Sequence, residues 1–188
     1  MLQSRIKALK PQDECNRQKE AIMNAKGLLT FFVVLAGLFW ISPPALAQQS
    51  PPDFAKATQI VALVKKAAAL LDSRCPLACR TAFAEFRKSD SEWQIGDTYL
   101  FLADMKGIAL FNAGFPKLEG TDVSGLKDAN GKLINVEFKK VVQSKGAGWV
   151  DYMWPKPGQT QPAQKWSYVK AVMVDGSPAY IGAGFYPE

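Results

Sequence analysis

The chain has 188 residues, of which 48% are hydrophobic and 21% are charged, as is usual for one globular domain with a short additional segment. The formal net charge of +6 divides equally, because six basic and three acidic residues precede position 48 and 17 basic and 14 acidic residues follow. The basic residues form nothing longer than adjacent pairs, which argues against a nucleic-acid partner.

The N-terminal part has the pattern of a secretory signal peptide. Lys26 precedes an apolar run at residues 28–41, and Ala45-Leu46-Ala47 supplies a small-residue cleavage site. The run is short for a membrane span, which needs about 20 apolar residues, and an uncleaved anchor is the alternative. We predict an N-terminal extension and signal peptide over residues 1–47, and a single folded domain over residues 48–188. Cleavage near Ala47 would leave that domain periplasmic or secreted.

Two helices are predicted at the start of this domain. Asp53 is a suitable N-cap, and apolar residues recur at helical spacing from Ile60 to Leu71. This pattern predicts an amphipathic helix of about five turns. Pro76 suits the first position of a second helix that runs to about Lys88.

Two cysteines lie between these helices. Cys75 and Cys79 are four residues apart and would share a face of a helix, and in an exported protein they are expected to form a disulfide. Closing so small a loop stabilises the fold by about 2 kcal/mol. The spacing is not that of thiol oxidoreductases, so thiol redox chemistry is the weaker alternative.

From residue 98 the apolar pattern changes to the period of two that is typical of strands. A turn at residues 105–107 predicts a hairpin, and a long, irregular connection rich in glycine follows it. Helices that cover an antiparallel sheet define an α+β fold. Strands are expected at residues 98–104, 108–112, 148–154, 165–174 and 179–186, with a helix at 132–144.

The strand at residues 148–154 carries aromatic rings on both faces. Alternation places Tyr152 and Trp154 on one face and Trp149 on the other. Such a strand lies in the centre of a sheet or forms the wall of a small-molecule pocket.

The sequence argues against catalysis. There is no histidine, which excludes Ser-His-Asp and Cys-His nucleophiles and ordinary zinc sites. No glycine-rich loop opens a helix after a strand, as phosphate binding would need. The turn at Asp128 lacks the glycine position and the final glutamate of a calcium loop. We therefore expect no enzyme activity, no cofactor and no metal.

Seven short motifs follow one another along the domain. They are Asp97-Thr-Tyr99-Leu-Phe101, Asp104-x-x-Gly107, Pro116-x-Leu-x-Gly120, Leu126-x-Asp128-x-Asn-Gly131-Lys, Gly148-Trp-Val-Asp-Tyr152-x-Trp154-Pro-x-Pro157, Lys165-x-x-Tyr168-Val-Lys170 and Gly182-x-Gly184-x-Tyr186. In this order they resemble the single Cache domains, which are PAS-like extracytoplasmic sensor domains. The resemblance covers about residues 54–186.

The resemblance implies a long N-terminal helix on one face of a five-stranded antiparallel sheet, with residues 148–154 as the middle strand. It also implies a pocket on the other face for a small organic ligand, often a carboxylate or an amino acid. Many members carry a histidine on or just after the second strand, where this chain has Phe111 and Asn112. Most members also continue into a signalling domain, whereas this sequence ends at Glu188.

A carboxylate ligand needs a cation and hydroxyl or amide donors in a partly dry site. Lys165 is the predicted cation, and Ser167 shares its strand face. Lys165 and Tyr168 point to opposite faces unless a bulge intervenes, so some of the proposed residues must be core. The predicted ligand-binding residues are Lys165, Tyr168, Tyr152, Tyr99, Phe101, Phe111, Trp149, Trp154 and Ser167.

Three functional hypotheses follow from the sequence. The leading one is an exported module that binds a small organic anion and presents it to a membrane receptor or kinase. The second is a structural or dimerising interaction module whose pocket is filled and whose N-terminal helix forms a homodimer. The third is thiol redox work by Cys75 and Cys79.

Overall fold

The computed structural model describes residues 50–75, 78–89 and 91–188. The predicted signal peptide, its cleavage site near Ala47 and the predicted helix start at Pro76 lie outside these ranges. Within them, no helix is both long enough and apolar enough to cross a membrane.

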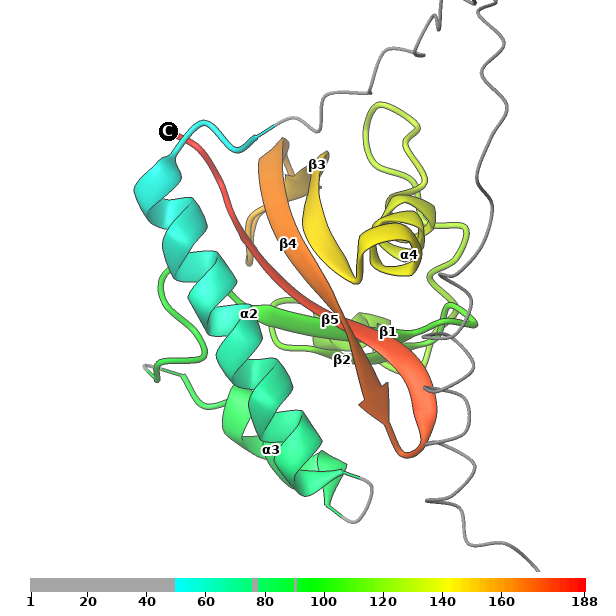
Figure 1. Ribbon diagram of the computed structural model, residues 1–188. Coiled ribbons are helices and arrows are strands. Elements are labelled where there is room, and N and C mark those ends of the chain that lie inside the picture. Colours follow the sequence, from blue (N-terminus) through cyan, green and yellow to red (C-terminus); the bar gives the residue numbers. More distant parts are fainter. Residues whose placement is uncertain (1–49, 76–77, 90) are drawn as a thin grey trace, which may run out of the picture. The chain divides into compact units, whose positions relative to one another are not determined.

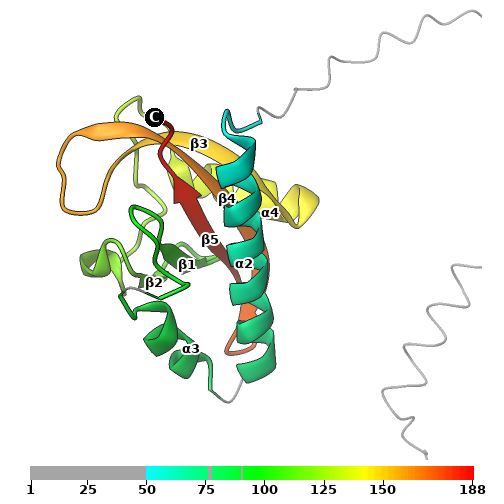
Figure 2. The same cartoon turned by 90° about the vertical axis from the view of Figure 1, so that its left-hand side faces the viewer.

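Helix α2 (Phe54–Arg74) covers one face of the sheet (Figures 1 and 2). It begins at the predicted cap, where the Asp53 side chain accepts a hydrogen bond of 2.9 Å from the backbone N–H of Lys56. The expected apolar stripe is buried and packs against the last two strands of the chain, at residues 162–174 and 177–185. The helix has 21 residues, about six turns, and is one turn longer than expected.

Helix α3 (Cys79–Phe86) begins at the second cysteine. The predicted disulfide is confirmed: Cys75 and Cys79 are bonded, with their Cα atoms 4.7 Å apart. Because Cys75 is also the C-cap of α2, the disulfide joins the end of one helix to the start of the next. The half-buried Arg74 and Glu85 form an ion pair of 2.7 Å between the two helices.

Five antiparallel strands form one sheet in the order β2-β1-β5-β4-β3. The prediction of five strands is confirmed, but the prediction that residues 148–154 form the middle strand is wrong, because β3 is an edge strand. The C-terminal strand takes the centre, and its interior is buried on both faces. The strands are β1 (Leu100–Asp104), β2 (Ala109–Asn112), β3 (Ala147–Pro155), β4 (Pro162–Val174) and β5 (Ser177–Phe185).

The hairpin between β4 and β5 puts the last strand in this place. Val174 pairs with Ser177 across a two-residue loop, and Asp175 and Gly176 have φ values of 49° and 75°. Positive φ at both loop positions matches the twist of the flanking strands. The loop therefore fixes the register of the β4–β5 pair.

A bulge separates the two ends of the β1–β2 pair. Leu102 lies opposite Phe111, but Ala103 lies opposite Ala109, so the register skips Leu110. A skipped residue turns the following side chains to the opposite face. Phe111 and Ala109 therefore point to different sides of the sheet.

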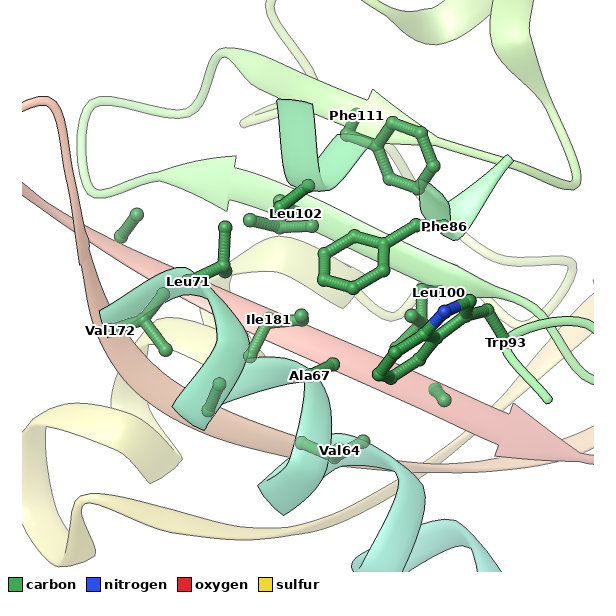
Figure 3. Close-up of a cluster of buried hydrophobic side chains, with 14 of the residues drawn as sticks. Val64, Ala67, Leu71, Phe86, Trp93, Leu100, Leu102, Phe111, Val172 and Ile181 are labelled. Atoms are coloured by element: carbon green, nitrogen blue, oxygen red, sulfur yellow. The ribbon is translucent and has the colours of Figure 1, made fainter. Parts of the chain in front are cut away.

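The face under α2 is an apolar core, shown in Figure 3. Phe86 of α3 contacts the rings of Trp93 and Phe111, with centroids 5.0 and 6.0 Å away. The side chains labelled in Figure 3 are Val64, Ala67, Leu71, Phe86, Trp93, Leu100, Leu102, Phe111, Val172 and Ile181.

The opposite face is covered by α4 (Ile134–Lys145) and by the connection that precedes it, residues 113–133 (Figure 1). This connection contains the short 3-10 helix η2 (Pro116–Leu118). Ile134, Phe138 and Val142 of α4 pack onto the sheet. Helix α4 ends at Gly146, which has the left-handed φ of 74° that favours glycine.

The same connection also covers the outer edge of β3. The carboxylate of Asp128 accepts a hydrogen bond of 2.9 Å from the backbone N–H of Met153. The ammonium group of Lys132 donates to the backbone carbonyl of Asp151 at 2.6 Å and to its carboxylate at 3.0 Å.

Candidate functional site

A small cavity lies between the sheet and its α4 layer. Its volume is about 50 Å³, and its walls come from β1, β2, β3, α4 and the connection before α4. Most lining groups are apolar, with hydroxyl and amide groups among them. The lining residues are Tyr99, Phe101, Leu102, Ala103, Ala109, Asn112, Leu118, Val123, Leu126, Ile134, Asn135, Phe138, Tyr152 and Trp154.

Lys165 lies behind this wall. Its side chain is 0% exposed, and its Nζ has no hydrogen-bond partner among the described residues. The Nζ lies 3.7 Å from the ring centroid of Tyr99, a lining residue, and 5.2 Å from that of Tyr186. The rings offer cation–π attraction but no lone pair for an ammonium N–H, so the donors of Lys165 are unsatisfied.

Alternation along β4 places Lys165 and Ser167 on the cavity face. Tyr152 pairs with Lys165 in the register, and its hydroxyl lies 3.0 Å from the Ser167 hydroxyl. A second unpartnered donor, the Trp166 Nε1, lies on the opposite face with the apolar core.

Three glycines leave the space that these side chains occupy. A Cβ atom on Gly184 would lie 2.3 Å from the Ser167 hydroxyl and 3.0 Å from Cε of Lys165. On Gly182 it would lie 2.5 Å from the Phe101 ring, and on Gly114 it would lie 2.6 Å from the Tyr99 ring. The glycine pair of the last motif thus accommodates the lysine, the serine and a lining ring.

Burial dominates the electrostatics of the site. It lowers the pKa of Lys165 well below 10.5, against the opposing charge of Asp97. The same loss of solvent raises the pKa of Tyr99, of Tyr152 and of Tyr186. The tyrosine hydroxyls of the site therefore stay protonated at neutral pH.

An ion pair and a shared acceptor hold the roof of the cavity. Arg87 donates to both carboxylate oxygens of Glu119, at 2.7 and 2.9 Å. Glu119 also accepts a 2.8 Å hydrogen bond from the backbone N–H of Asn112, and the Asn112 side chain accepts one from Phe115 N–H. Arg87, at the end of α3, thereby holds the first part of the connection of residues 113–133 over the cavity.

The predicted ligand-binding residues divide between the two faces. Tyr99, Phe101, Tyr152 and Trp154 line the cavity, and Lys165 and Ser167 lie on the same face behind it. The β3 face that meets the cavity is thus the one with Tyr152 and Trp154.

The three remaining predicted residues lie on the opposite face and are not part of the cavity. Trp149 and Tyr168 contact each other there, with ring centroids 5.4 Å apart, as alternation requires. Phe111 lies in the apolar core, because the bulge at Leu110 reverses its direction.

The sequence reasoning missed Asn135 and Tyr186. Asn135 is buried, donates to the Val123 carbonyl at 2.7 Å and accepts from the Tyr180 hydroxyl. Its spacing from Phe138 matches the apolar face of α4, so a polar residue in that stripe was a usable signal. Tyr186 lies two and four residues after Gly184 and Gly182, so alternation along the chain places it on the same face of the sheet, that of the cavity.

No three His, Cys, Asp or Glu side chains gather as a metal site would require in the part of the chain that the structure describes. The groups that the candidate site offers to a ligand are the buried amine of Lys165, several hydroxyl groups and a small apolar space.

The molecule is an α+β domain with a cavity between its sheet and one of two covering layers. Residues 86–188, more than half of the chain, match the family model described as Cache domain. The chain belongs to the Cache domain family.

Known relatives are chemotaxis sensors. The methyl-accepting chemotaxis protein McpP of Pseudomonas putida (strain KT2440) is 32% identical over 92 residues, which are 49% of this chain and 16% of McpP. The matched region is thus about a sixth of that receptor.

Two solved structures share the fold over most of their length. A periplasmic sensor domain of a chemotaxis protein has a TM-score of 0.62 and 31% identity, covering 71% of this chain and 96% of that domain. A Cache chemosensory domain described for carboxylic acid recognition has a TM-score of 0.61 and 28% identity, covering 71% and 95%. The prediction of a Cache-type sensor fold is confirmed.

Proposed function

We propose that the cavity and Lys165 together bind a small organic anion, either a carboxylate or an amino acid through its carboxylate. The observation that carries the proposal is the unpartnered amino group of Lys165, buried beside a mostly apolar cavity that the hydroxyl-bearing Tyr99 and Tyr152 help to line. A buried charged donor without a partner is costly. A carboxylate would relieve that cost by accepting charge-assisted hydrogen bonds.

The relatives support sensing without catalysis as the use of this binding. One similar domain is described for carboxylic acid recognition, and others are chemotaxis sensors. By analogy, the domain acts in the periplasm or outside the cell. It reports occupancy to a membrane receptor or kinase.

The size of the cavity restricts the ligand. Its volume of about 50 Å³ is well below the roughly 300–1,000 Å³ of sites for drug-sized ligands. A ligand of a few non-hydrogen atoms fits this space, provided that its carboxylate displaces the Tyr99 ring from Lys165.

The small volume also favours a second candidate function. An interaction module with a filled pocket would need no ligand and would act as a homodimer through α2. Thiol redox work has no comparable support, because Cys79 is disulfide-bonded and only 1% exposed, whereas reactive thiols are accessible.

Calorimetry and thermal-shift measurements with short carboxylates and amino acids test the first proposal. We expect saturable binding and stabilisation of the wild type, and loss of both in Lys165→Met. Lys170→Met is the matched control, since Lys170 lies on the same strand but points to the opposite face. A stable dimer by light scattering, together with no response to any compound, would support the interaction module instead.

A further inference from the structure

Aromatic rings surround the Lys165 amine, and no hydrogen-bond acceptor meets it among the described residues. Its Nζ is enclosed by the rings of Tyr99, Tyr186 and Phe101, at 3.7, 5.2 and 5.9 Å from their centroids. It is fully buried and has no hydrogen-bond partner. The ring faces attract a positive charge at this atom, but neither solvent nor a hydrogen-bond acceptor replaces the hydration that burial removes.

The titratable groups around Lys165 offer no free counter-charge. The phenols of Tyr99 (before β1), Tyr152 (β3) and Tyr186 (after β5) are protonated, because burial raises the pKa of each. Asp97 is the carboxylate whose charge acts on Lys165, but it forms an ion pair of 2.9 Å with Lys156. Ser167 completes the set and does not titrate in this range.

A buried amine in this position does not have to carry a charge. It can release its proton and leave a neutral group, which costs far less to bury. The pKa of Lys165 is accordingly lowered well below 10.5 by burial, with Asp97 opposing.

We propose that the empty domain holds Lys165 as a neutral amine, and that an anionic ligand and a proton enter the site together. This inference rests on the proposed function, because it concerns the binding event at the same site. The amine nitrogen takes up the proton through its lone pair, and the resulting ammonium pairs with the carboxylate. Binding of a carboxylate anion then removes one proton from solution, and the net event is uptake of the undissociated acid.

The ammonium and the carboxylate stabilise each other, because each lowers the free-energy cost of burying the other's charge. An anion near the amine favours its charged form, and the ammonium compensates for the buried carboxylate. Linkage then requires the apparent affinity to fall by about tenfold per pH unit above the pKa of the empty amine. A ligand that met a permanently charged lysine would show no such slope.

Titration calorimetry of the full chain with sodium acetate and sodium propionate tests the inference. Measurements at pH 7.5 and 9 in buffers of different ionisation enthalpy give the number of protons taken up per ligand. We expect a value near one for the wild type and for Lys170→Met at pH 9, and a weaker affinity at pH 9 than at pH 7.5. Binding with no proton uptake at either pH overturns the inference and leaves the proposed function intact.

A second measurement needs no ligand. NMR titration of the lysine Cε resonances in the ligand-free full chain should show one resonance, missing in Lys165→Met, that titrates at lower pH than the others. A midpoint equal to that of the exposed lysines overturns the inference. Absence of binding by every carboxylate would overturn the proposed function, and with it the joint entry of ligand and proton, whatever the midpoint.

Discussion

The two faces of the sheet bury different kinds of side chain. The face under α2 is filled by aliphatic and aromatic groups such as Leu71 and Phe86, whereas the face under α4 also encloses Lys165, Ser167 and Asn135. The α2 face also buries one unpartnered donor, the Trp166 Nε1, but that group is a neutral indole, whereas an amine that keeps its charge is far more costly to bury. The α2 face is thus the more uniformly apolar part of the core, and the α4 face holds the polar groups on which the proposed binding depends.

The largest effect is expected from truncating the apolar face. Phe86→Ala removes a ring that is 0% exposed and should lower the free energy of unfolding by about 3–5 kcal/mol, measured by urea denaturation. Phe54→Ala is the matched control, since the same change is made at a side chain that is 86% exposed. The carboxylate affinity of the folded Phe86→Ala fraction should be unchanged. A large loss of affinity would show that the two faces of the sheet do not act independently.

The next effect concerns the space around Lys165. In Gly184→Ala the new methyl group would meet the Ser167 hydroxyl at 2.3 Å and the Trp166 backbone oxygen at 2.4 Å. Because backbone cannot move aside cheaply, we expect a loss of about 3 kcal/mol and weaker carboxylate binding. Gly125→Ala, where no atom lies within 4 Å of the added carbon, should change neither quantity. Equal behaviour of the two variants would contradict the packing described.

Removing the disulfide should act on the α2 side alone. Cys75→Ala with Cys79→Ala frees a short loop, and the expected loss is about 2 kcal/mol in thermal unfolding. The reduced wild type should behave like the double variant. Carboxylate affinity should stay at the wild-type value, and a redox-dependent affinity would revive the thiol hypothesis.

The smallest effect has the opposite sign. Lys165→Met should stabilise the empty domain at neutral pH by about 1 kcal/mol, because it removes an unpartnered buried donor. The folded pKa of Lys165 is lowered, so above it the unfolded chain binds a proton that the folded chain does not, and stability rises with pH until the lysine is neutral in both states near 10.5. The advantage of Lys165→Met should therefore shrink as pH rises toward this value. Chemical denaturation at several pH values measures it, and destabilisation at neutral pH would refute the account.

Local patterns were sufficient to predict most of the fold. The Asp53 cap and the stripe after it predicted α2, and period-two runs predicted all five strands, because these signals depend on neighbours along the chain. Alternation also grouped Lys165 with Ser167, and Tyr152 with Trp154. The resemblance supplied the side on which a pocket should lie.

What the sequence did not reveal depends on contacts between distant segments. The bulge at Leu110, which turned Phe111 away from the cavity, arises from pairing with β1 and leaves no local signature. The edge position of β3 depends on which strand takes the centre. An aromatic strand with rings on both faces occurs at an edge here because α4 covers one of its faces, while Trp149 on the other face packs against Tyr168 and Phe185.

The seal on the edge of β3 has a consequence for how the protein behaves at high concentration. An edge strand with free backbone groups is a template for another chain, and addition of strands there leads to aggregation. Here Asp128 occupies the N–H of Met153 and Lys132 occupies the carbonyl of Asp151. Without Asp128 the Met153 N–H would lose its acceptor, so we expect such a chain to add strands at this edge more readily.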